Sequence, residues 1–331
     1  MGKNEQMSNR KKRRINLWAL FYSIALTGYT IFTLLYTFVI PRDVVSMSGA
    51  WNSVNQEKEV NHGDENQQIA GEKSGIEEGR EQEDTMMPVI TDNSYESSTI
   101  SIKIDTIREY DTDIYVADIR LKSAQSLLSG LAKNSFGRNV TEKTSEIAKD
   151  NDAIFAVNGD FYGFRDEGYV MRNGYLYRST KRSGNNNEDL VIYEDGSFEI
   201  INESEVTAGE LEEKGAVQIF SFGPGLIQDG EIIVGEKDEV DQSMTSNPRT
   251  AIGMIEPLHY IIVVSDGRTS ESEGLTLYQL AGLMKEYGCT QAYNLDGGGS
   301  STMWFNGEIV NQPTSHGKIK ERSVSDIVFI R

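Results

Sequence analysis

A run of three glycines between an aspartate and two serines is the segment of this sequence best suited to chemistry. After Asp296 come, in order, Gly297, Gly298, Gly299, Ser300 and Ser301. Successive glycines let the backbone aim several N–H groups at one anion, and hydroxyl groups add further donors. No Gly-Lys-Ser/Thr follows, so this is not a Walker loop. The segment predicts a phosphate-binding loop, and the alternative interpretation is a tight turn between two strands.

Three other loops place polar side chains directly after or at the start of apolar segments. They contribute Asn158, Gly159 and Asp160, then Arg249 and Thr250, then Asp266 and Arg268. Loops at the ends of strands commonly carry function, and a guanidinium can grip a phosphate through two hydrogen bonds. Taken singly, each loop is equally consistent with an ordinary turn, and a lone arginine is equally consistent with a surface charge.

The elements that would position these loops are strands, with few helices. The segments predicted as strands are 99–104, 114–119, 153–157, 190–193, 261–264 and 327–330. One helix is well marked, because Thr276 and Gln279 have the spacing of a capping box and Gly288 lies where a C-terminal cap belongs. Asp195-Gly196 and Asn306-Gly307 are typical hairpin turns. We predict an α+β fold, a mixed β-sheet domain over residues 99–331.

The net charge of −19 is unevenly distributed along the chain. Residues 1–45 carry +5, residues 46–100 carry −9, and the remainder carries −15. A domain this acidic lacks the basic surface that nucleic-acid binding requires, so we expect no nucleic-acid partner. Any phosphate that binds must be held by local groups.

Residues 15–40 contain no charged side chain, and this stretch is long enough to cross a bilayer of about 30 Å. Basic residues crowd the preceding tail, residues 1–14, which the positive-inside rule places in the cytoplasm. We therefore predict a single-pass cell-membrane protein with an extracytoplasmic C-terminal domain. The alternative is a cleaved signal peptide, since Ser48-Gly49-Ala50 resembles a cleavage site. Residues 41–98 are polar and acidic and are predicted to form a disordered linker.

Histidine and cysteine offer little for a metal site. The histidines His62, His259 and His316 are scattered, so we predict no zinc-type centre and no cofactor. The three candidate aspartates could instead hold a hard cation such as calcium. Cys289 is the only cysteine, which excludes an intrachain disulfide, and we interpret it as structural.

Taken together and in order, the motifs resemble those of the phosphodiester glycosidase family. The resemblance rests on VNGDFYG, PRTAIG, VVSDGR and the segment from EGLTLYQLAGLM to NLDGGGSSTMWFNG, and it covers residues 150–331. SFGPGLIQDG and ERSVSDIVFI also match. Asp160 departs from the family pattern, which often has glycine there.

The resemblance implies hydrolysis of the sugar C1–O bond of a sugar-1-phosphodiester in a surface polysaccharide or glycoconjugate. It implies that the glycine loop, with Arg249 and Arg268, holds the phosphate and that Asn158 contacts a sugar hydroxyl. Asp296 ranks first as the catalytic carboxylate, ahead of Asp266 and Asp160. Two alternatives stay open: a non-catalytic binding or assembly module for phosphate-containing exopolysaccharide, and cleavage of the P–O bond.

Overall fold

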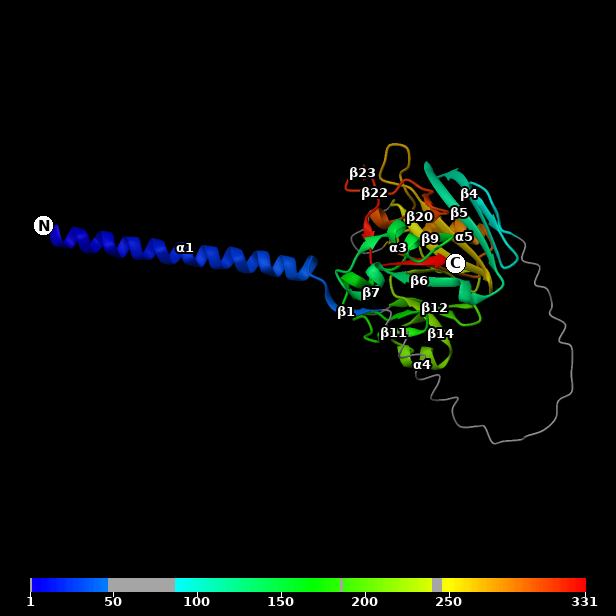
Figure 1. The fold of residues 1–331 in the computed structure, drawn as a ribbon, viewed down its shortest axis with the longest axis horizontal. Coiled ribbons are helices and arrows are strands. Elements are labelled where there is room, and N and C mark those ends of the chain that lie inside the picture. The colour runs from blue at the N-terminus through cyan, green and yellow to red at the C-terminus, as the bar shows by residue number, and fades with distance from the viewer. Residues whose placement is uncertain (1, 47–86, 185–186, 240–245) are drawn as a thin grey trace, which may run out of the picture.

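The N-terminal helix α1, Gly2–Phe38, projects away from the rest of the protein (Figure 1). A computed structural model describes residues 2–46, 87–184, 187–239 and 246–331, with side chains from Leu17 onward. Within α1, Leu17–Phe38 spans 22 residues with a mean hydropathy of 1.5, and its side chains are exposed. At about 1.5 Å per residue this length matches a bilayer, so α1 is a candidate membrane span.

The largest sheet has nine antiparallel strands and supplies three of the four candidate loops. In spatial order they are β16 (Glu231–Ile232), β15 (Gly225–Gln228), β19 (Gln291–Asn294), β17 (Arg249–Glu256), β18 (His259–Ser265), β5 (Thr112–Leu121), β4 (Ile100–Glu109), β3 (Ser94–Glu96) and β2 (Val89–Ile90).

Two five-stranded sheets complete the framework, and every pairing within them is antiparallel. The first is β21 (Glu308–Ile309), β20 (Met303–Phe305), β9 (Phe155–Asn158), β25 (Asp326–Ile330) and β6 (Leu127–Leu131). The second is β11 (Tyr175–Arg178), β10 (Val170–Arg172), β14 (Ala216–Phe220), β12 (Glu188–Tyr193) and β13 (Phe198–Asn202).

Smaller elements join these sheets. Three two-stranded pairs are β1 (Arg42–Ser46) with β7 (Ser135–Arg138), β22 (Thr314–Ser315) with β23 (Lys318–Ile319), and β24 (Ser323–Val324) with β8 (Glu142–Lys143). The further helices are α3 (Thr144–Asp150), α4 (Ala208–Glu213), α5 (Leu277–Glu286), η1 (Ala124–Ser126), η2 (Ala132–Asn134), η3 (Tyr162–Phe164) and η4 (Gly298–Ser300).

One apolar core lies among the three large sheets. It combines residues of β4, β5 and β17–β19 with residues of β9, β20 and β25 and of β12–β14. α5 covers the other side of the nine-stranded sheet, α3 packs on the β9–β25 sheet and α4 on the third sheet. The predicted α+β class is confirmed. The predicted capping box of α5 is also present, since Gln279 N donates to Thr276 Oγ1 over 3.1 Å.

The described ends of the interval predicted as a linker include three strands. β1 lies at its start, and β2 and β3 lie at its end, where they extend the large sheet beyond β4. These short strands form because partner strands offer them backbone hydrogen bonds, a tertiary effect that composition does not reveal. Residues 47–86, the centre of the predicted linker, lie outside the described part of the chain.

Strand β1 joins α1 directly to the folded domain. It pairs with β7, with Val45 opposite Phe136. The Asn139 amide donates to the carbonyls of Thr37 (3.2 Å) and Ile40 (3.0 Å), which lie at the C-terminal end of α1. Helix C-terminal carbonyls otherwise lack partners, so Asn139 caps the helix and attaches it to the domain. We call the β1–β7 pair with Asn139 the anchor clamp.

Asn139→Ala should loosen this clamp. It removes two hydrogen bonds worth about 1 kcal/mol each, so amide hydrogen exchange of residues 42–46 is expected to accelerate at least fivefold. Asn93→Ala is the matched control, because the Asn93 amide likewise donates to a backbone carbonyl, that of Ile104, at a different place. Equal exchange in wild type and Asn139→Ala would contradict a capping role.

Candidate functional site

The register of the nine-stranded sheet brings three of the predicted loops to one edge. Arg249, at the start of β17, is paired with Ser265, at the end of β18, and Ala251 is paired with Asn294, at the end of β19. Because these neighbours are antiparallel, the loops after β18 and β19 emerge beside the start of β17. The fourth loop, after β9, comes from a different sheet.

The buried amide of Asn158 connects this fourth loop to the others. Its Nδ2 donates to the carbonyl of Asp296 (2.6 Å), and its Oδ1 accepts from Thr250 Oγ1 (2.8 Å) and from the Thr302 N–H (3.2 Å). The Asp296 N–H in turn donates to the Gly159 carbonyl (3.1 Å). Asn158 is fully buried. These contacts give it a positioning role beneath Asp296, and its predicted contact with a sugar hydroxyl stays untested.

The glycine loop forms the single turn η4 and uses much of its backbone internally. The N–H groups of Gly298, Ser300 and Ser301 donate to nearby backbone carbonyls, which leaves those of Gly297 and Gly299 without an acceptor among the described residues. Gly298 has φ +61°, a conformation that favours glycine. Two N–H groups of the loop, those of Gly297 and Gly299, are therefore not used internally, fewer than the sequence suggested.

Asp296 lies at the centre of the loop cluster. Its Oδ2 accepts from Ser300 Oγ (2.6 Å) and from Arg322 Nη2 (2.9 Å), while its Oδ1 accepts from no described residue. The residue is 8% exposed. Burial raises the pKa of Asp296, and the charge of Arg322 acts in the opposite direction. One oxygen of a buried, ion-paired carboxylate is thus open to a ligand.

Two guanidinium groups flank the glycine loop. A Cβ at Gly298 would lie 2.9 Å from Arg268 Nη2, and one at Gly299 would lie 3.5 Å from Arg322 Cδ. Arg268 is exposed and donates to the neutral Oδ1 of Asn247 (2.7 and 3.0 Å). Burial and then the charge of Arg322 lower the pKa of Arg268, so the two cations are near each other. Asp296 is the carboxylate that offsets them, which leaves a local positive charge.

The sequence-based candidates missed Arg322. It lies in a run of charged residues near the C-terminus, and a lone arginine in such a run is typical of a solvated surface. Only the ERSVSDIVFI match to the family pointed toward this segment. Its approach to Asp296, 26 residues away, depends on the return of the chain through β22 and β23.

Arg249 is arranged differently from Arg268. It is buried, its Nη2 forms an ion pair with Glu239 (2.8 Å), and its Nε donates to the Leu275 carbonyl (2.9 Å). Burial lowers the pKa of Arg249, and the contact with Glu239 opposes that shift. These partners favour a structural role for Arg249, and its predicted contact with a phosphate stays untested.

Asp266, the second-ranked carboxylate, has both oxygens occupied. Oδ1 accepts from the Gln312 N–H (2.8 Å) and from Asn311 Nδ2 (3.1 Å), and Oδ2 accepts from the Tyr115 hydroxyl (3.2 Å). Burial raises the pKa of Asp266, whereas these hydrogen bonds lower it. Asn311 also donates to the Ser301 carbonyl (3.1 Å), so Asp266 supports the glycine loop from behind.

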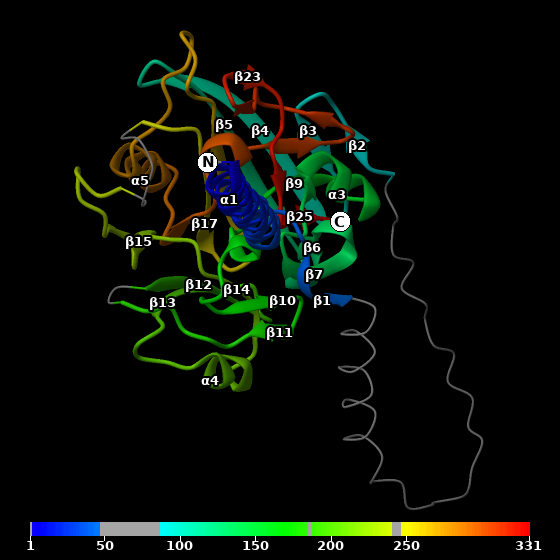
Figure 2. The ribbon, with the colours of Figure 1, turned by 90° about the vertical axis from the view of Figure 1, so that its left-hand side faces the viewer.

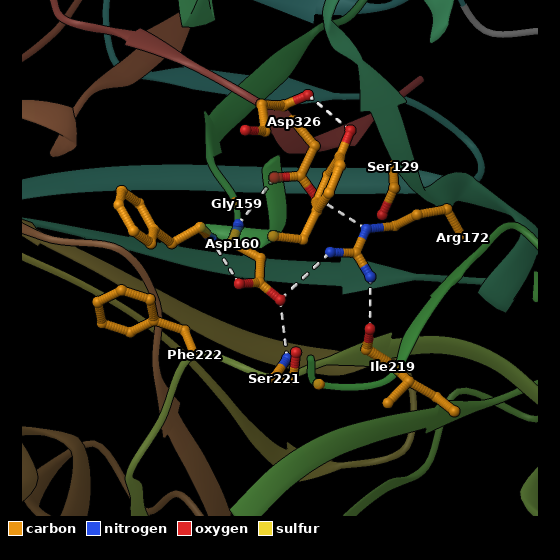
Figure 3. A network of polar contacts seen from close by, with 12 residues as sticks. Ser129, Gly159, Asp160, Arg172, Ile219, Ser221, Phe222 and Asp326 are labelled. Carbon is orange, nitrogen blue, oxygen red and sulfur yellow. Dashed lines mark hydrogen bonds and ion pairs between the residues drawn. The ribbon is translucent and has the colours of Figure 1, made fainter. Parts of the chain in front are cut away.

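Asp160 belongs to a buried network around Arg172 (Figure 3). Arg172 Nε donates to Asp326 Oδ2 (2.7 Å), its Nη2 pairs with Asp160 Oδ2 (3.5 Å), and its Nη1 donates to the Ile219 carbonyl. Asp160 Oδ2 also accepts from the Ser221 N–H (2.8 Å). Because the side chains of Asp160, Arg172 and Asp326 are at most 1% exposed, Asp160 cannot meet a substrate in this arrangement.

A cavity of about 610 Å³ is lined by Phe222 and by polar and charged residues, and neither Asp296 nor the glycine loop is part of its lining. Three contacts connect its wall to the motifs: Gly223 O accepts from Asn294 Nδ2 (2.8 Å), Glu239 pairs with Arg249, and Arg165 Nη1 donates to the Ser221 carbonyl (2.9 Å). The volume is in the range of small-molecule sites.

The sequence model of the phosphodiester glycosidase family matches residues 151–331, which hold all four loops. The chain belongs to the phosphodiester glycosidase family. Within the matched range, Asn158 and Arg322 contact Asp296 directly. Among the described residues, no three His, Cys, Asp or Glu side chains form a metal-binding group.

Two relatives show how far this membership extends. The chain is 30% identical over 261 residues to the SPbeta prophage-derived uncharacterized protein YomE of Bacillus subtilis, which covers 73% of this chain and 39% of that protein. It is 29% identical over 187 residues to the human N-acetylglucosamine-1-phosphodiester alpha-N-acetylglucosaminidase, covering 52% and 35% respectively. The chain thus spans about two fifths or less of each relative.

The fold also resembles that of a solved member. The catalytic domain of the zebrafish N-acetylglucosamine-1-phosphodiester alpha-N-acetylglucosaminidase, auto-inhibited by its pro-peptide, superposes with a TM-score of 0.56. It is 23% identical and the match covers 70% of this chain and 82% of that one. At this identity the likeness concerns the phosphodiester glycosidase fold alone.

Arg172→Met should destabilise the protein by about 3–5 kcal/mol, because it leaves two buried carboxylates without their cation. The measurement is urea unfolding of the detergent-solubilised chain at pH 7. Arg172→Met combined with Asp326→Asn should recover part of the loss by removing one buried charge. A loss below about 1 kcal/mol in the single variant would contradict the role assigned to Arg172.

Asp326 should also make stability depend on pH. Burial raises its pKa from 3.8 to about 6, with the Asp160 charge adding to the shift and Arg172 opposing it. Between these values the folded state binds more protons than the unfolded state, so this contribution to the free energy of unfolding falls as pH rises from about 4 to about 6.

Asp326→Asn removes that titration, so the variant should gain stability relative to wild type as pH rises through this interval. Urea unfolding in a pH series measures the difference. Asp195→Asn is the control: hydrogen bonds from Ser197 lower the pKa of Asp195, so its difference from wild type should stay constant between about pH 5 and 8. A flat difference for Asp326→Asn would contradict the raised pKa.

Proposed function

We propose that this protein is a membrane-anchored, extracytoplasmic hydrolase that cleaves the sugar C1–O bond of a sugar-1-phosphodiester. Family membership supports a phosphodiester glycosidase, and one observation carries the site assignment. The Oδ1 of Asp296 accepts no hydrogen bond from a described residue, while Oδ2 accepts from Arg322, and both Arg322 and Arg268 lie against the adjoining glycine loop. Such a site can bind a phosphate and act on the adjacent carbon at once.

The phosphate would be held by Arg268 and Arg322, with the N–H groups of Gly297 and Gly299 as further donors. This assignment favours two arginines over the buried Arg249, because Arg249 already pairs with Glu239. Charge-assisted hydrogen bonds from arginine to phosphate are strong and directional. The two arginines concentrate positive charge at one point of an acidic domain. A phosphate bound at that point requires this charge, because the rest of the domain is negative.

Asp296 would supply the carboxylate, either by activating water or by attacking C1. In the overall reaction the hydroxyl of water joins C1, the C1–O bond breaks, and the bridging oxygen leaves with the phosphate. A phosphomonoester has a second pKa of about 6, so it departs with charge stabilisation and little need for a general acid. The transition state has oxocarbenium character, which a neighbouring carboxylate stabilises.

The sugar would occupy the cavity beside Phe222. Its wall adjoins the strand that leads to Asp296, through Gly223 and Asn294, and it offers both carboxylates and guanidinium groups to hydroxyls. The human relative is named for N-acetylglucosamine, so we propose this sugar as the first substrate to test. The alternative function, a binding module for phosphate-containing exopolysaccharide, would use the same loop without turnover.

The test compares Asp296→Asn with Asp266→Asn on an N-acetylglucosamine-1-phosphate methyl diester. Asp296→Asn should lower the rate of free sugar release by about 10²–10⁴-fold, because it removes the reacting carboxylate. Asp266→Asn keeps acceptors for Gln312 and Asn311 and should retain most activity. Arg322→Gln should cost about 10²-fold by removing a charge that stabilises the leaving phosphate.

Two outcomes would overturn the proposal. Wild-type protein that binds the diester without releasing sugar is a binding module. Release of sugar 1-phosphate instead of free sugar would establish P–O cleavage.

A further inference from the structure

The hairpin of β22 and β23 is a basic projection on an acidic domain. Its exposed residues include Lys318 and Lys320, and between them Ile319 is 63% exposed. The nearest acid, Glu321, is turned inward and accepts from Ser145. Residues 101–331 carry −15 overall, so two lysines around an exposed isoleucine stand apart from their surroundings.

This hairpin lies on the side of the domain that α1 approaches (Figure 1). In Figure 2, where α1 is seen nearly end-on, the domain spreads behind the helix and β23 lies above it. The anchor clamp fixes this direction, because β1 follows α1 after three residues and pairs with β7. If α1 crosses the bilayer, the β22–β23 hairpin faces the lipid headgroups.

The composition of the hairpin suits that position. Lysines near a membrane surface are attracted to anionic headgroups, and an apolar side chain between them can enter the interfacial layer. An exposed isoleucine is otherwise unremarkable on a soluble surface, but here it projects toward the bilayer with a cation on each side.

The same hairpin borders the candidate site. Ser315, on β22, lies beside the glycine loop, since a Cβ at Gly299 would be 3.2 Å from its hydroxyl. Arg322, two residues after Lys320, donates to Asp296. The groups that would hold the phosphate are therefore next to the segment that would contact the membrane.

We propose that the β22–β23 hairpin contacts the bilayer surface and that the substrate is a lipid-linked sugar-1-phosphodiester whose lipid stays in the membrane. This inference rests on the proposed hydrolase function and on α1 as the anchor. The oxygen of water would bond to C1 as the bond from C1 to the bridging oxygen breaks, one proton of water would pass to Asp296 and then to solvent, and the lipid would keep the phosphate as a monoester. In this arrangement the sugar phosphate of a lipid-linked substrate lies a short distance from Arg268 and Arg322, whereas a distant soluble polymer does not.

The activity test uses the full chain in vesicles containing one-third anionic lipid and two substrates that share one sugar phosphate. One substrate is the soluble methyl diester, and the other is a polyprenol diester in the same bilayer. The variant Lys318→Glu/Lys320→Glu should turn over the polyprenol diester about tenfold more slowly than wild type and the methyl diester within twofold. Lys122→Glu/Lys214→Glu, with the same charge change at exposed lysines elsewhere, should resemble wild type on both.

Equal rates for the two double variants on the polyprenol diester would overturn the membrane contact. Wild-type turnover of the methyl diester without turnover of the polyprenol diester would overturn the lipid-linked substrate. If the wild-type protein turned over neither substrate, the proposed hydrolase function itself would be overturned.

A second measurement tests the contact without any catalysis. In a Cys289→Ser background, a fluorophore is attached at His316→Cys, in the hairpin, or at Asp92→Cys, between β2 and β3 on the opposite side of the domain (Figure 1). A headgroup-bound quencher should quench the label at 316 at least threefold more than the label at 92. Equal quenching at both positions would overturn the predicted orientation.

Discussion

The buried guanidinium of Arg172 is the interaction on which the geometry of the site depends. It binds Asp326 and Asp160, and the Asp326 main chain and side chain then accept from the Gly159 and Asp160 N–H groups. Gly159 in turn accepts from Asp296. A buried ion cluster of this kind is costly to desolvate, so it is weak evidence for stability. Its structural consequence is a continuous series of contacts that runs from Arg172 through Asp326 and Gly159 to Asp296, and this series fixes the position of Asp296.

The packing at Gly159 shows how tightly this path is constrained. A Cβ there would lie 2.6 Å from the Asp326 carboxylate, so the residue has no room for a side chain. The next position, often glycine in the family, is Asp160 here. Its carboxylate turns away from the loop cluster toward Arg172, so the departure from the family pattern adds an internal ion pair and no accessible acid. The site consequently has one carboxylate with an open oxygen where the sequence offered three candidates.

Much of the framework could be predicted because its signals are local. Each of the six predicted strand segments overlaps a strand, with β4 and β9 beginning one and two residues later than predicted, and the helix after Thr276 begins with its predicted capping box. The four loops could be named because each adjoins an apolar strand. Arg172, Arg322 and Asp326 could not, since their partners come from remote parts of the chain: Arg172 and Asp326 are 154 residues apart. Composition also failed at β1 to β3, where pairing with established strands outweighs local polarity.

The distribution of charge would allow an acidic protein to act on the proposed acidic substrate at the proposed acidic surface. Negative charge over most of the domain repels both phosphate and anionic lipid, and within about 10 Å this repulsion is not screened away. In the proposed function Arg268 and Arg322 would overcome it at the glycine loop, and Lys318 and Lys320 would overcome it at the hairpin beside that loop. The repulsion elsewhere would then favour the proposed approach to the bilayer, in which the hairpin and the site face the headgroups.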